Sequence, residues 1–139
     1  MKKILKVGVL GAAKIAKTHI IPAMNNIEQL NVWGVSSREL SKAKAYIHAL
    51  EPECITHQII AVESYEAMIN HPEIDVIYNP LPNHLHVELS LKAIEAGKHV
   101  LCEKPLALNA GQAKQLALAI SDEVEELIAS GTTIIQIDE

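Results

Sequence analysis

Short apolar runs of strand length alternate along this chain with segments whose apolar residues recur at helical spacing. The runs are nearly continuous in valine, isoleucine and leucine, which is the pattern of strands buried on both faces. Strands of this kind form a parallel sheet with helices on both sides. The sequence therefore predicts a doubly wound α/β domain with three layers, α/β/α.

The pattern also gives approximate bounds for the elements. Strands are expected at residues 4–10, 31–36, 74–78, 99–102 and 132–137, with a weaker third strand within 54–60. Helices are expected at residues 14–25, 40–50, 64–70, 83–96 and 109–130. Asn83 and Asn109 are expected to cap the helices they precede, while Gly97 and Gly131 follow two helix ends. With 139 residues, we expect one Rossmann-like domain with the strand order 3-2-1-4-5-6.

Charge and composition exclude several classes of protein. The formal net charge is −5 and the basic residues form no stripe, so nucleic acid is not an expected partner. No apolar run reaches the roughly 18 to 20 residues of a membrane helix, and the glycine-broken first residues do not resemble a signal peptide, which favours a cytoplasmic protein. Cys54 and Cys102 lack C-x-x-C spacing, so we expect buried, reduced thiols. The histidines, including His84 and His86, lack ligand spacing, so no metal site is expected.

A turn with a single glycine joins the first strand to the first helix, in the sequence VGVLGAAKIAKTH. In the dinucleotide motif G-x-G-x-x-G/A, the first glycine makes the turn, the second admits the pyrophosphate, and the third position needs a small residue. Gly11, Ala13 and Ala16 occupy these positions. The methyl group of Ala13 narrows the approach, but backbone N–H groups and the helix N-terminus still attract phosphate. An ordinary tight turn is the alternative. The candidate binding residues of this turn are Gly11, Ala12, Ala13, Lys14 and Ile15.

The residues after the second strand bear on the choice of cofactor. NAD-selective domains place an acidic residue there for the ribose 2′-hydroxyl, whereas an arginine accommodates the 2′-phosphate of NADP. Here Ser37 and Arg38 follow the strand, Glu39 comes next, and Lys42 lies one helical turn further on. This favours NADP(H) over NAD(H). The alternative is that Ser37 only caps the helix and Arg38 is a solvated charge.

The stretch DVIYNPLPNHLHVELSLKAIEAGKHVLCEKPLALN, residues 75–109, resembles the oxidoreductase family of glucose-fructose oxidoreductase, inositol 2-dehydrogenase and the dihydrodiol dehydrogenases. The resemblance runs from the N-terminus to about residue 110 and includes GAAKIA, so that family tolerates the missing middle glycine. It implies that Lys104 of the E-K-P motif, between Glu103 and Pro105, lies beside the nicotinamide and the substrate. It also implies a cofactor groove lined by Pro80, Leu81, Pro82, Asn83 and His86.

The position of these residues in the predicted sheet agrees with such a site. They follow two strands at their carboxyl ends, the edge where open α/β sheets bind ligands. A lysine there can hydrogen-bond a substrate hydroxyl or carbonyl and assist proton transfer during hydride exchange. From the residues alone, a solvated surface charge is the alternative for Lys104.

The last residues, QLALAISDEVEELIASGTTIIQIDE at 115–139, resemble a second family, the catalytic barrel of cobalamin-independent methionine synthase. That resemblance implies that Asp138 and Glu139 correspond to residues of a homocysteine pocket, with solvated carboxylates as the alternative. We therefore interpret the chain as an engineered chimera with a crossover between 108 and 118, and a natural truncated gene is the alternative. Residues 1–114 would be the dinucleotide-binding part, and 115–139 a helix–strand unit from a TIM barrel, which suits a parallel sheet.

Three functions follow as hypotheses. The first is a domain that binds NADP(H) without turnover, because the large substrate domain of the oxidoreductase family is not expected in this chain. The second is a folding scaffold without a ligand, and the third is a polyol or sugar oxidoreductase completed by oligomerisation. Gly11, Arg38 and Lys104 favour the first over the second. In that family the substrate domain covers part of this unit, so without it we expect an exposed apolar patch. Such patches tend to pair, which predicts a weak homodimer.

Overall fold

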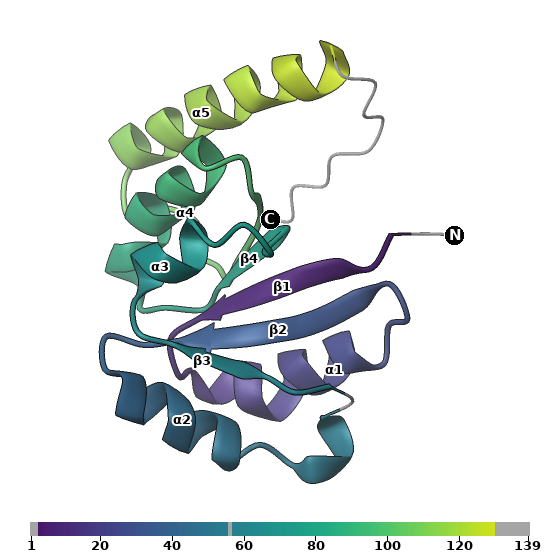
Figure 1. Ribbon diagram of the computed structural model, residues 1–139. Helices are drawn as coiled ribbons and strands as arrows, with labels where there is room; N and C mark the ends of the chain where they lie inside the picture. Colours follow the sequence, from purple (N-terminus) through teal and green to yellow (C-terminus); the bar gives the residue numbers. More distant parts are fainter. Residues whose placement is uncertain (1–2, 56, 130–139) are drawn as a thin grey trace.

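A parallel sheet of five strands forms the centre of the molecule, whose computed structural model describes residues 3–55 and 57–129 (Figure 1). The strands are β1 (Leu5–Leu10), β2 (Leu30–Ser36), β3 (Ile60–Val62), β4 (Val76–Asn79) and β5 (His99–Cys102). Their order, β3-β2-β1-β4-β5, confirms the Rossmann-like arrangement over these residues. All four pairings are parallel, with one shift of register between Val7 and Gly8. The predicted strand at 132–137 lies outside the described residues.

Helices cover both faces of this sheet, as the buried strands require (Figure 1). One face carries α1 (Ile21–Asn25), entered through the π-helical turn η1 (Ala16–Ile20), and α2 (Leu40–His48). The other face carries α3 (Tyr65–Ile69) and α4 (His86–Glu95), and α5 (Ala110–Ala129) packs against α4. Two short 3₁₀ turns complete the described elements, η2 (Pro52–Cys54) and η3 (Asn83–Leu85).

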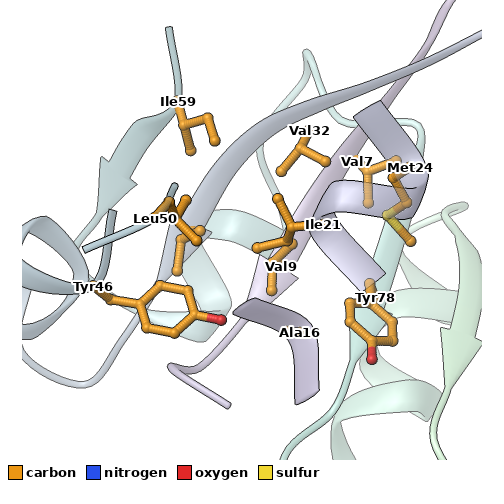
Figure 2. Close-up of a cluster of buried hydrophobic side chains, with 11 residues drawn as sticks. Val7, Val9, Ala16, Ile21, Met24, Val32, Tyr46, Leu50, Ile59 and Tyr78 are labelled. Atoms are coloured by element: carbon orange, nitrogen blue, oxygen red, sulfur yellow. The ribbon is translucent and has the colours of Figure 1, made fainter. Parts of the chain in front are cut away.

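Each face of the sheet has its own apolar core. The core beneath α1 and α2 includes Val7, Val9, Ile21, Val32, Tyr46 and Tyr78 (Figure 2). The core beneath α3 and α4 includes Leu10, Met68, Ile69, Ile77, Leu81 and Leu89. Successive residues of a strand point to opposite faces, so β1 contributes Val9 to the first core and Leu10 to the second.

Two helix signals in the sequence are confirmed. Gly97 adopts φ +72° just after α4, and its N–H donates to the carbonyl of Ile94 while that of Lys98 donates to Ala93. This is the Schellman arrangement that satisfies the last carbonyls of a helix. At the start of α5, Asn109 Oδ1 accepts a hydrogen bond of 2.9 Å from the N–H of Gln112.

Three expectations need correction. The third strand lies at Ile60–Val62 and not within 54–60, because Pro52 starts a 3₁₀ turn and the strand forms only where it can pair with the end of β2. Asn83 caps no helix, since Pro82 precedes η3 and neither η3 nor α4 has a side-chain cap. Cys102 is a free thiol, but it is half-buried, because β5 lies at the edge of the described sheet. The side chain of Cys54 lies outside the described part.

Candidate functional site

The loops that follow β1, β2, β4 and β5 meet at the carboxyl edge of the sheet, where the sequence places its candidate residues. The N–H of Gly11, directly after β1, donates a 2.8 Å hydrogen bond to the carbonyl of Ser36 at the end of β2. The N–H of Glu103, directly after β5, donates a 3.0 Å bond to the carbonyl of Asn79 at the end of β4. Backbone hydrogen bonds thus join the loops in neighbouring pairs.

The turn after β1 depends on a residue without a side chain. Gly11 is buried and adopts φ +78°, in the left-handed region that glycine enters at little cost. A Cβ at this position would lie 2.5 Å from Leu81 Cδ2, so the side chain of Leu81 already fills that space. The turn and the loop after β4 are therefore packed against each other with no room for a larger residue.

The two alanines of the motif pack against the core beneath the turn. Ala13 is half-buried and packs against the core beneath α1 and α2, and Ala16 is fully buried in it. The hydroxyl of Tyr46 in α2 donates a 2.7 Å hydrogen bond to the carbonyl of Ala13. Burial raises the pKa of Tyr46 from its ordinary 10.0 to about 12, so the phenol remains a donor even above pH 10. The remaining candidates of the turn, Ala12, Lys14 and Ile15, are exposed.

The residues after β2 divide into a buried serine and exposed charges. Ser37 is buried, and its hydroxyl accepts a hydrogen bond of 3.5 Å from the N–H of Glu39, which is the residue before α2. Lys42 Nζ lies 2.8 Å from Glu39 Oε1, and this partner holds the pKa of the glutamate carboxyl below its usual value. Arg38 is exposed and forms no ion pair with the described part of the chain. The guanidinium group of Arg38 is thus free of an ion pair with the described residues.

The E-K-P loop after β5 is anchored on one side by a buried tyrosine. The hydroxyl of Tyr78 in β4 donates a 2.6 Å hydrogen bond to Glu103 Oε1. Burial, together with the neighbouring carboxylate of Glu103, raises the pKa of Tyr78, which keeps the phenol protonated. Lys104 is exposed and makes no hydrogen bond or ion pair within the described residues, and the Lys104–Pro105 peptide bond is cis.

The loop after β4 is held by a buried histidine. His86 is 1% exposed, with Nδ1 at 2.7 Å from the carbonyl oxygen of Pro105 and Nε2 at 2.5 Å from that of Leu81. The histidine ring therefore bridges this loop to the E-K-P loop. Of the predicted groove residues, Pro80, Leu81 and His86 are buried, whereas Pro82 and Asn83 are exposed.

Asn79 fixes the same loop from below. Its amide nitrogen donates to the carbonyl of His86 and to the hydroxyl of Ser90, each at 3.2 Å. Its amide oxygen accepts from the N–H of Leu81 at 3.3 Å. Since Asn79 is fully buried, these bonds satisfy a side chain that would otherwise be costly to bury.

Sequence reasoning missed Tyr46, Tyr78 and Asn79. A usable signal was present, because the chain has three tyrosines and no phenylalanine. A tyrosine at an apolar position, where phenylalanine would fill the space, indicates that the hydroxyl has a partner. Tyr46 and Tyr78 lie at opposite sides of the same core (Figure 2). An asparagine at the end of a continuous apolar strand, as in Asn79, points to the same kind of role.

The described residues offer neither a metal-binding cluster nor a membrane-spanning helix. The described part contains no group of three or more histidine, cysteine, aspartate or glutamate side chains able to hold a metal ion. Among the described helices, none is long and apolar enough to cross a membrane.

The sequence matches the model of a known family over residues 5–128, described as an oxidoreductase family with an NAD-binding Rossmann fold. A dTDP-3,4-didehydro-2,6-dideoxy-alpha-D-glucose 3-reductase from Saccharopolyspora spinosa is 39% identical over 116 residues, 84% of this chain and 33% of the relative. A D-xylose 1-dehydrogenase (NADP(+)) from Haloferax volcanii is 33% identical over 129 residues, 93% of this chain and 35% of the relative.

Solved structures agree with the sequence relatives. A 3-ketoreductase from Actinomadura kijaniata, in complex with NADP and TDP-benzene, superimposes with a TM-score of 0.76 at 34% identity. The match covers 86% of this chain and 34% of that one. The chain thus spans about a third of the length of the proteins it matches.

These matches bear on the expected junction at 108–118. The family match covers that interval and the start of the segment at 115–139 that resembles a barrel. It gives no support to a second parent family there, and the acidic end of the segment lies outside the described residues. From its sequence, its sheet order and its solved relatives, the chain belongs to the oxidoreductase family with an NAD-binding Rossmann fold.

Proposed function

We propose that this chain binds NADP(H) across the carboxyl edge of its sheet. The pyrophosphate lies at the turn of Gly11, the 2′-phosphate at Ser37 and Arg38, and the nicotinamide beside Lys104. The observation that carries the proposal is the turn itself, in which a left-handed Gly11 packs against Leu81 and is hydrogen-bonded to the end of β2. This geometry places the backbone of a segment with small residues, Gly11 to Ala13, directly before the start of a helix.

Phosphate recognition at this turn needs backbone groups more than side chains. The first N–H groups of a helix have no acceptor within the helix, and the helix dipole makes that end positive. The chain is helical from Lys14 onward, so these groups lie directly after the turn. Tyr46 fixes the carbonyl of Ala13 in the same segment. The turn is therefore preorganised for an anion of the pyrophosphate type.

The preference for NADP(H) is supported by Arg38. A guanidinium group can make two parallel hydrogen bonds to a phosphate, which NADP offers at the ribose 2′ position and NAD does not. Glu39, the nearest acidic residue, already pairs with Lys42. The names of two relatives, the D-xylose 1-dehydrogenase (NADP(+)) and the 3-ketoreductase in complex with NADP, agree with this preference.

We assign Lys104 a role in hydride transfer between the nicotinamide and a substrate. When bound, the nicotinamide supplies or accepts the hydride. The ammonium group of Lys104 would donate a hydrogen bond to the oxygen of a carbonyl or hydroxyl on the carbon that reacts. Two relatives are named for a sugar nucleotide and for a sugar, which supports a sugar-like alcohol or ketone as the substrate class.

Turnover by these 139 residues alone is not expected. Hydride transfer needs the reacting carbon held about 3 to 3.5 Å from the nicotinamide in an aligned pose. Lys104 supplies one contact, and the relatives use chains about three times as long. We therefore propose binding without catalysis for the chain on its own.

The test is a titration of the purified chain with NADPH, followed by nicotinamide fluorescence. Saturable binding, weaker for NADH, is expected, together with no oxidation of polyols or sugars. No binding at millimolar NADPH would favour a folding scaffold without a ligand. Oxidation of a polyol that disappears in Lys104→Ala would instead favour an enzyme completed by oligomerisation.

Two further expectations stay predictions. A weak homodimer is expected, and light scattering over a wide concentration range checks it, with a constant monomer mass as the contrary result. The derivation of residues 115–139 from a barrel protein also stays a prediction, and the binding proposed above does not depend on it.

A further inference from the structure

Two buried side chains hold the residues on either side of Lys104. On one side, the hydroxyl of Tyr78 donates to the carboxylate of Glu103 at 2.6 Å. On the other, His86 Nδ1 lies 2.7 Å from the carbonyl oxygen of Pro105. Lys104 itself is exposed and has no partner within the described residues. The direction of its side chain therefore depends on how its two neighbours are held.

We propose that Tyr78 and His86 are positioning residues that present Lys104 to the nicotinamide end of the cofactor. The inference rests on the function proposed above, because it takes the nicotinamide to lie beside Lys104. It adds that neither ring touches the cofactor, and that both act through the backbone and carboxylate of the E-K-P loop.

The surroundings of His86 exclude a direct contact with a ligand. Its ring is 1% exposed, and both ring nitrogens face backbone carbonyl oxygens, those of Pro105 and Leu81. A carbonyl oxygen only accepts hydrogen bonds, so each ring nitrogen that bears a proton donates to one of the two loops. The ring thus lies between the loop after β4 and the loop after β5, and neither of its nitrogens faces a ligand.

The same ring links the two ends of the proposed cofactor site. Leu81, whose carbonyl oxygen lies 2.5 Å from His86 Nε2, also fills the space beside Gly11. His86 therefore connects the E-K-P loop, through Leu81, to the turn proposed for the pyrophosphate. A displacement of either loop changes the distance between Lys104 and that turn.

Tyr78 contacts one loop, whereas His86 contacts two. Its ring belongs to the core beneath α1 and α2, and only the hydroxyl reaches the E-K-P loop. Phenylalanine would keep the ring contacts and remove the bond to Glu103. Tyr78→Phe is therefore the mildest available change to the held loop, and it leaves no buried backbone group without a partner.

Each variant has a matched control in this chain. Tyr46→Phe also removes a buried hydroxyl, but from the turn at Ala13 and not from the E-K-P loop. His84→Leu removes an exposed histidine two residues before His86. Tyr78→Phe and His86→Leu are compared with these controls and with the unchanged chain.

Binding is measured with two ligands, NADPH and 2′-phospho-ADP-ribose, which lacks the nicotinamide. We expect Tyr78→Phe to lower the affinity for NADPH about three- to tenfold and to leave that for 2′-phospho-ADP-ribose unchanged. His86→Leu also releases Leu81 beside the turn of Gly11, so it is expected to weaken the binding of both ligands. Tyr46→Phe is expected to lower the affinity for both ligands equally. His84→Leu is expected to change neither affinity. An equal loss for both ligands in Tyr78→Phe, or no loss for either, would overturn the proposal.

A second measurement does not need a cofactor. In the unliganded chain, Tyr78→Phe should speed hydrogen exchange of the Glu103 amide, which is bonded to Asn79, and lower the ¹⁵N order parameter of Lys104. Unchanged values at both residues would show that Tyr78 does not hold the loop. If the unchanged chain binds neither ligand, the proposed function fails, and these two values alone decide whether the loop is held. If His86→Leu does not fold, Tyr78→Phe carries the test.

Discussion

The side chain of Leu81 occupies the place where a side chain of residue 11 would stand, because a Cβ built on Gly11 lies 2.5 Å from Leu81 Cδ2. The two residues belong to loops that follow neighbouring strands, β1 and β4. Their contact fills the space between the two loops. The proposed pyrophosphate site depends on this contact.

Gly11→Ala tests that dependence through stability. The left-handed φ of +78° costs an L-residue roughly 1–2 kcal/mol, and the overlap with Leu81 adds the cost of overpacking, about 1–3 kcal/mol. Gly97→Ala is the matched control, because Gly97 has φ +72° but no atom within 4 Å of a Cβ. Urea unfolding should show a larger loss for Gly11→Ala by about 1 kcal/mol or more. Equal losses would mean that Leu81 moves aside freely.

Tyr46→Phe is expected to change how stability depends on pH. The pKa of Tyr46 is raised from its ordinary 10.0 to about 12 in the folded chain, mainly by burial. Because the pKa is higher in the folded chain than in the unfolded chain, the protonated phenol of Tyr46 contributes to stability. This contribution is complete below pH 10 and is lost as the pH rises from 10 towards 12. Urea midpoints should therefore fall less steeply over this range in Tyr46→Phe than in the unchanged chain. Parallel curves would contradict the buried, neutral phenol.

Arg38→Ala is expected to alter the choice of cofactor. A hydrogen bond to a charged group contributes about 1.5–3 kcal/mol, so the affinity for NADPH should fall about tenfold or more. The affinity for NADH should change little, because NADH has no 2′-phosphate. Lys44→Ala removes an exposed charge from α2 and serves as the control for net charge. An equal change for the two cofactors would refute a 2′-phosphate contact at Arg38.

The fold could be predicted wherever burial alone decides the structure. The continuous apolar runs gave β1, β2, β4 and β5 to within two residues, because strands buried on both faces need apolar side chains throughout. The third strand was misplaced, since residues 60–62 are too few to show a pattern and form a strand only by pairing with β2. Its position is set by the partner strand and not by its own residues.

The candidate site could be predicted from the sequence only where a short local motif marks it. The turn of Gly11 and the E-K-P loop carry local motifs. The bonds from Tyr78 to Glu103 and from His86 to Pro105 join residues 25 and 19 positions apart, and no local pattern encodes such partners. His86 was expected to line the groove, but its ring lies inside, because the fold places two carbonyl oxygens around it.

The central claim is that a dinucleotide lies across the carboxyl edge of this sheet. The most direct measurement is a map of ¹H–¹⁵N chemical-shift changes as NADPH is added to the chain. The account predicts that the largest changes gather at Gly11 to Ile15, at Ser37 and Arg38, and at Glu103 and Lys104. A separate pocket lies between α3 and α4 and is lined by Glu66 and Lys92 among others. Changes concentrated around that pocket, or spread evenly over the surface, would contradict the account.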